Sequence, residues 1–170
     1  MFYTSTPSEL LLSTVLSITA VTVITLIFIP HWTSALFVGP IMIMLYADLL
    51  GFLQVCGIAI NSITFISLVL SIGLMVDFLV HVLLRYYESE ALTRAEKVKD
   101  ALQTMGVSVL IGGFSTFLGV IPLAFASSDI FHTLFITFLG LVVLGLAHGL
   151  IFLPVVLSLL GPNVELNLSL

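Results

Sequence analysis

Five long runs of almost wholly apolar residues divide this sequence, and they decide what the chain can fold into. A helix needs about 20 residues to cross the hydrocarbon core of a bilayer, and each run is at least about that long. Only 8% of the residues are charged, too few to cover the surface of a soluble domain. We therefore expect an all-α, polytopic membrane bundle with five transmembrane helices, over residues 10–29, 35–55, 58–84, 107–126 and 130–160.

The runs favour helices over strands, although residues 14–29 are rich in Val, Ile and Thr. Their length and their lack of two-residue alternation are typical of helices. Pro154 has no backbone N–H, so we expect a kink or a loosened last turn near the end of the fifth span. Thr93 and Glu96 match a capping box and predict a short interfacial helix that leads into the fourth span.

The basic residues predict how the chain is oriented in the membrane. They all lie between the third and fourth spans, and the positive-inside rule places this loop, residues 85–106, in the cytoplasm. Five crossings then put residues 1–9 on the extracytoplasmic side and residues 163–170 in the cytoplasm. The basic residues are Arg85, Arg94, Lys97 and Lys99.

Several classes of site are disfavoured by the composition. Residues 1–9 contain no Lys or Arg and the first apolar run is long, so we expect no secretory signal. We infer that a segment upstream is missing or that the chain is half of a larger assembly. Cys56 is the only cysteine, which excludes an internal disulfide and predicts a small buried hydrophobic residue. We expect no metal, no cofactor and no nucleic-acid partner, because metal-type ligand clusters and polybasic segments are absent from the sequence.

Asp77 is a carboxylate within an otherwise apolar span. At the bilayer centre an acidic side chain costs on the order of 2.5–3.5 kcal/mol, so such residues usually face the interior of a bundle and have a function. Gly73 and His81 lie on the same helix face, one turn before and one turn after it. This pattern suits an ion-coupling site in which Asp77 binds a proton or a sodium ion. The alternative is a structural aspartate that is hydrogen-bonded between helices.

Two other polar residues lie within predicted spans. Asp48 is near the far end of the second span, where water could reach it, and we expect a structural or surface role. His148 is deeper in the fifth span, where it could donate to a backbone carbonyl or line a cavity. We treat both residues as possible secondary polar sites.

Small residues predict close helix packing, because helices in lipid associate through close approach. Ser108, Gly112 and Thr116 recur at every fourth residue of the fourth span, and Gly119 lies on an adjoining face with Ser115. Three glycines recur in the fifth span. Together these residues predict a tightly packed bundle around Asp77. The three glycines are Gly140, Gly145 and Gly149.

Five motifs, in this order, resemble the C-terminal membrane half of the Patched and Niemann-Pick type C proteins. These proteins belong to the resistance-nodulation-division transporter superfamily. The resemblance covers residues 10–162, nearly the whole chain. The motifs are GIAINSI at residues 57–63, GLMVDFLVH at 73–81, MGVSV at 105–109, HGLIFLP at 148–154 and GP at 161–162.

The resemblance implies a role for particular residues. Asp77 and Gly73 fall on the family's Gly-x-x-x-acidic motif, which is associated with cation-driven movement of sterols or other lipids, and His81 matches a common histidine. The implied partners are an N-terminal transporter half, on the same or a separate polypeptide, a membrane lipid or sterol, and a proton or sodium ion. The first half, its acids and its extracytoplasmic domains are not in this sequence.

Two other function classes remain open. Asp48 and Asp77 superficially suggest an intramembrane aspartyl protease, but the surrounding residues do not match the motifs of such enzymes, and we expect no enzymatic activity. A non-transporting membrane subunit, retained for assembly or lipid contact, is the stronger alternative. A tunnel from the membrane leaflet to the far side would favour transport, and a heavily substituted or solvent-blocked cavity beside Asp77 would favour the subunit.

Overall fold

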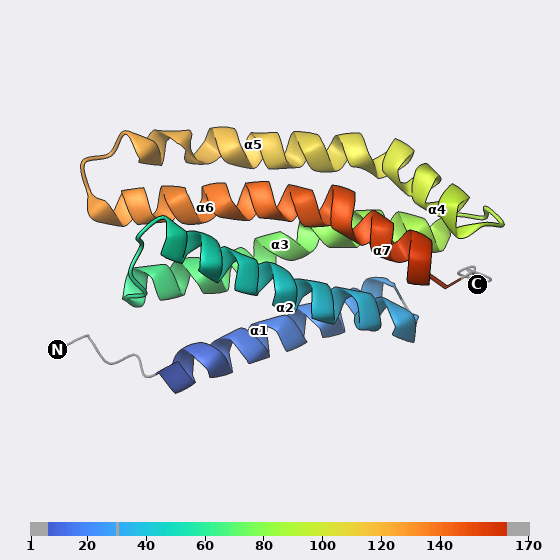
Figure 1. Ribbon diagram of the computed structural model, residues 1–170, viewed down its shortest axis with the longest axis horizontal. Coiled ribbons are helices and arrows are strands. Elements are labelled where there is room, and N and C mark those ends of the chain that lie inside the picture. The colour runs from blue at the N-terminus through green and yellow to red at the C-terminus, as the bar shows by residue number, and fades with distance from the viewer. Residues whose placement is uncertain (1–6, 30, 163–170) are drawn as a thin grey trace.

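The structure is a computed structural model that describes residues 7–29 and 31–162, and over these ranges it is helical and has no strand (Figure 1). The described part contains five helical columns that are long and apolar enough to cross a membrane, which confirms the predicted fold class. The first three columns are α1 (Pro7–Phe28), α2 (Trp32–Val55) and α3 (Ser62–Glu88). The fourth joins α4 (Arg94–Ala101), η1 (Leu102–Gly106) and α5 (Val107–Ala124), and the fifth joins α6 (Asp129–Ala147), η2 (His148–Phe152) and α7 (Leu153–Leu160).

The third helix begins four residues later than its apolar run, at Ser62 instead of residue 58. The side chain of Asn61 accepts a hydrogen bond from the backbone N–H of Thr64 and caps the helix. Gly57, with φ of 73°, turns the chain just before this cap. The Asn61 cap therefore sets where α3 begins, although the apolar residues extend from residue 58, before the cap, into the helix.

Two π-helical turns, η1 and η2, interrupt the long fourth and fifth columns. In η2 the N–H of Leu153 donates to the carbonyl of His148, five residues back. Pro154 follows directly, and because it has no N–H it cannot continue the α-helical ladder to Leu150. The kink or loosened turn that we expected near Pro154 therefore takes the form of the π-helical turn η2, which lies just before the proline. α7 then continues to Leu160.

α3 lies at the centre of the bundle and packs against α1, α2, α4 and α6. α5 packs mainly on α6 and makes few contacts with α3. Most apolar side chains of α1 and α5 point outward, as expected of helices that face lipid or another membrane partner. Val109 and Gly113 are the buried residues of α5.

The glycines of the fifth column allow close packing against α2 and α3. A β-carbon at Gly145 would lie 2.7 Å from the ring of Phe78, and one at Gly149 would overlap the backbone carbonyl of Phe78. Gly140 makes room for Phe52 in the same way. These contacts agree with the packing expected of small residues in this span.

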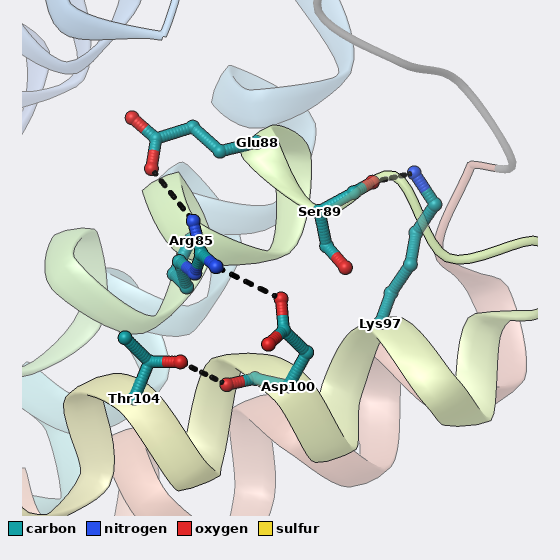
Figure 2. A network of polar contacts seen from close by, with 6 residues as sticks. All are labelled: Arg85, Glu88, Ser89, Lys97, Asp100 and Thr104. Carbon is teal, nitrogen blue, oxygen red and sulfur yellow. Dashed lines mark hydrogen bonds and ion pairs between the residues drawn. The ribbon is translucent and has the colours of Figure 1, made fainter.

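Charged residues gather where α3 ends and α4 begins (Figure 2). The guanidinium of Arg85 lies 3.3 Å from the carboxylate of Asp100 and 3.7 Å from that of Glu88. Lys97 is 2% exposed, and its ammonium donates to the carbonyl of Ser89 at 2.7 Å. The predicted loop over residues 85–106 is therefore ordered: it comprises the end of α3, a short turn, α4 and η1. The predicted capping box of Thr93 and Glu96 begins α4 and is confirmed.

We expect Gly149→Ala to destabilise the bundle by about 1–3 kcal/mol, because the added methyl group overlaps a backbone atom that cannot move aside. The measurement is the thermal unfolding midpoint in detergent or nanodiscs. Gly112→Ala is the matched control, since a β-carbon there meets nothing within 4 Å. Equal midpoints for the two variants would contradict this account of the packing.

Cys56 tests the predicted orientation. It is exposed at the C-cap of α2, so the expectation that it is buried is wrong; α2 ends at Val55, and Cys56 lies outside the packed part of the helix. If the basic end is cytoplasmic, a membrane-impermeant maleimide should label Cys56 from the extracytoplasmic side of intact vesicles. In a Cys56→Ala background, Leu92→Cys, which replaces an exposed residue between α3 and α4, should be labelled from the cytoplasmic side alone. The opposite pattern would reverse the topology.

Candidate functional site

Asp77 and His81 lie one turn apart on α3 and line the same cleft, as their spacing predicts. The cleft has a volume of about 490 Å³ and lies between α3 and the column of η1 and α5, and Leu141 of α6 also contributes to its wall. Both polar side chains are exposed in it. The lining residues are Leu74, Asp77, Phe78, His81, Met105, Ser108, Val109, Gly112, Thr116 and Leu141.

The small residues of α5 line this cleft and do not close it. Ser108, Gly112 and Thr116 face the α3 side, and a β-carbon at Gly112 would meet nothing within 4 Å. The same holds for Gly119, and for Gly73 on α3. The tight contact around Asp77 that these residues predict is therefore not made among the described helices.

The reason is the face through which α5 joins the bundle. Gly113, next to Gly112 in sequence, makes the close contact: a β-carbon there would lie 2.9 Å from the side chain of Leu146 on α6. Because α5 packs on α6 through Gly113, its residues Ser108, Gly112 and Thr116 face α3 instead. α5 makes few contacts with α3. Small residues suit both close packing and an open wall, so their spacing alone could not distinguish the two outcomes.

The carboxylate of Asp77 has no hydrogen-bond or ion-pair partner in residues 7–29 and 31–162. An unpaired carboxylate in a low-dielectric region is costly, and protonation or a bound cation relieves that cost. Ser108 and Thr116 add hydroxyl oxygens to the opposite wall. Thr116 donates its own proton to the carbonyl of Gly112, at 2.9 Å, so its oxygen can only accept from a group in the cleft. The cleft therefore presents a carboxylate, an imidazole and two hydroxyl groups within an otherwise apolar lining.

The structure brings together Asp48 and His148, which are 100 residues apart in the sequence. The Nε2 atom of His148 lies 3.2 Å from the carboxylate of Asp48, and Nδ1 lies 2.9 Å from the carbonyl oxygen of Leu144. The carbonyl contact is one of the two roles that the sequence left open for His148. The sequence did not predict that Asp48 and His148 are paired, because no local pattern indicates that α2 and the fifth column lie side by side at these two residues.

No family model matches this chain, but several curated proteins are similar to it in sequence. The NPC1-like intracellular cholesterol transporter 1 of Rattus norvegicus is 40% identical over 125 residues, which is 72% of this chain and 9% of the relative. Protein patched homolog 1 of Caenorhabditis elegans is 32% identical over 154 residues, 90% of this chain and 11% of the relative. A Niemann-Pick type C1-related protein of Toxoplasma gondii is 30% identical over 147 residues, 86% of this chain and 12% of the relative.

The chain belongs to the Patched and Niemann-Pick type C family. The predicted resemblance of the chain to this family is thereby confirmed. The match extends over most of the chain, which includes five columns able to span a membrane, so this is an integral, multi-pass membrane chain of that family. It spans about a tenth of the length of these relatives.

Proposed function

We propose that this chain is the C-terminal membrane half of a Patched- and Niemann-Pick type C-like transporter of the resistance-nodulation-division type. In this proposal it moves a sterol or another lipid, uses a proton or sodium gradient and catalyses no covalent reaction. Asp77 binds the coupling cation and His81 relays a proton or hydrogen-bonds the carboxylate. The observation that supports the proposal most is the open cleft in which Asp77 and His81 lie together and Asp77 has no described partner.

The coupling follows from the charge of Asp77 in a medium of low dielectric. When the carboxylate of Asp77 is ionised, it attracts cations and separates from a polar partner only at a high cost. When it is protonated or binds sodium, it is close to neutral and can move past apolar surfaces. Such a change of charge favours one arrangement of α3 and α5 over another. A gradient of the cation would then drive a cycle of arrangements.

The exposed face of α3 is the surface that we assign to the N-terminal half. Ile66, Leu70 and Leu74 are 57%, 56% and 39% exposed, and they lie on a stripe with Asp77. Gly73 lies on the same side with open space around it. A second half that packs here would bring its own acids close to Asp77, so that the two halves could share protons. The basic end of the bundle would face the cytoplasm.

The two alternative classes are less well supported. A protease needs two aspartates that face one substrate, but Asp48 contacts His148 and does not line the cleft of Asp77. A non-transporting subunit would be favoured by a blocked cavity beside Asp77. The cleft instead has an open volume of about 490 Å³.

Replacing Asp77 tests the coupling. In the complete protein, Asp77→Asn keeps the shape of the side chain and removes its charge, so we expect at least about a tenfold loss of pH- or sodium-dependent lipid transport. Asp77→Glu should retain part of it. The assay is transfer of a labelled sterol in proteoliposomes with an imposed gradient.

Asp129→Asn is the matched control, because Asp129 is an exposed acid in the first turn of α6. It should leave transport unchanged. Undiminished, gradient-dependent transport by Asp77→Asn would refute the coupling role. Wild-type protein that assembles normally and shows no gradient-dependent transfer of any lipid would favour the non-transporting subunit.

Filling the cleft tests whether its open volume matters apart from its charge. Gly112→Leu adds a side chain where a β-carbon meets nothing, so the fold should keep its thermal unfolding midpoint. Transport should fall several-fold, because α3 and α5 could no longer approach each other. Transport at the wild-type rate with the cleft filled would show that this volume is not used.

A further inference from the structure

Phe78 follows Asp77 on α3 and lies where the cleft meets the fifth column. Its side chain is 7% exposed, and it lines the same cleft as Asp77 and His81. It also contacts two glycines of the fifth column, Gly145 of α6 and Gly149 of η2. Phe78 therefore belongs both to the wall of the cleft and to the contact that holds the fifth column against α3.

The two glycines are needed for the space that they leave and not for their backbone conformation. Among the described residues, Gly57 is the one glycine with a positive φ. A β-carbon at Gly145 would lie 2.7 Å from the ring of Phe78, and one at Gly149 would overlap its backbone carbonyl. The fifth column thus fixes both the side chain and the backbone of the residue next to Asp77.

The ring of Phe78 can yield in few directions. In an α-helix an aromatic side chain has few allowed rotamers, because one of the staggered positions clashes with the preceding turn. The fifth column occupies one side of the ring, and the open volume that the ring adjoins is the cleft. Closely packed side chains transmit strain, so a shift of the fifth column towards α3 would push the ring into the cleft.

We propose that Phe78 is a positioning residue, which couples the place of the fifth column to the width of the cleft and to the position of the Asp77 carboxylate. The space at Gly145 accommodates the ring, and the cleft stays open. A shift that closes this space drives the ring towards Asp77 and narrows the cleft. The steric coupling does not need the proposed function, but its consequence for ion coupling rests on the proposed role of Asp77.

A matched contact elsewhere on α6 provides a control. A β-carbon at Gly140 would overlap the ring of Phe52 on α2, much as one at Gly145 approaches the ring of Phe78. Phe52 is not among the residues that line the cleft. A change at Gly140 therefore imposes the same kind of steric strain on α6 without moving a wall of the cleft.

Labelling of a cysteine in the cleft tests the proposal in the complete protein in lipid nanodiscs. The reporter is Ser108→Cys, which replaces an exposed hydroxyl group of the cleft wall, and the probe is N-ethylmaleimide. Mass spectrometry separates the labelled peptides, so that Cys56, exposed at the C-cap of α2, reports general reactivity in the same sample. Gly145→Ala should slow labelling of residue 108 several-fold and leave that of Cys56 unchanged. Gly140→Ala should leave both rates unchanged.

Removing part of the ring should have the opposite effect. Phe78→Leu should speed the labelling of residue 108 several-fold. Combined with Gly145→Ala, it should return the rate towards that of the wild type, because the smaller side chain leaves room for the added methyl group. Phe52→Leu is the control and should leave the rate unchanged.

Three results would overturn the proposal: an unchanged rate in Phe78→Leu, an equal slowing by Gly140→Ala and Gly145→Ala, or no labelling of residue 108 in the otherwise wild-type protein. If Gly145→Ala does not assemble, Phe78→Leu decides alone.

Transport distinguishes the role of Phe78 from the proposed function. Gradient-dependent lipid transport should fall several-fold more in Gly145→Ala than in Gly140→Ala, and adding Phe78→Leu should restore part of it. Equal losses in the two glycine variants would contradict the coupling of Phe78 to Asp77. Wild-type protein without gradient-dependent transport would refute the proposed function, while the labelling rates would still decide whether Phe78 sets the width of the cleft.

Discussion

The bundle depends on the close approach of the fifth helical column to α3. Gly145 and Gly149 leave space for Phe78, so that η2 lies directly against the backbone of the central helix. In lipid there is little hydrophobic expulsion to hold helices together, and close contact of this kind provides much of the attraction. The rest of the bundle follows from it, because α6 also carries α5 on one side and contacts α2 on another.

This packing divides the polar groups of the membrane region into two sites. The glycine contacts occupy one face of α3, which leaves Asp77 and His81 on another face towards α5. On the fifth column, the same contact fixes the start of η2, where His148 reaches across to Asp48. Each site thus has one carboxylate and one histidine, and the tightly packed strip between α3 and η2 includes Phe78, the residue next to Asp77.

Much of this could be predicted from the sequence, where the signal was local and periodic. Run length gave the number of spans, and helical spacing placed Asp77 with His81 and Ser108 with Gly112 and Thr116 on common faces. Helix ends were less predictable, since Asn61 caps α3 within a stretch that apolarity alone would have made helical. The pairing of Asp48 with His148 was beyond reach, because it depends on the relative height and rotation of two helices that are distant in sequence. The spacing of Ser108, Gly112 and Thr116 could not show whether these residues pack against another helix. They line an open cleft because α5 packs on α6 through the next residue, Gly113.

The way in which α5 is attached has a mechanical consequence. α5 is held along its length by α6, and at its base the chain is fixed by the contacts of Arg85 with Asp100 and of Lys97 with Ser89. None of the residues that line the cleft forms a hydrogen bond or an ion pair between α3 and α5 that would hold these two helices at a fixed distance. The distance between α3 and α5 is therefore held by the packing of α5 on α6 and of η1 on α3, and not by polar contacts across the cleft. A lateral force on α5 would therefore change the width of the cleft beside Asp77 without breaking a hydrogen bond or an ion pair among the residues that line it.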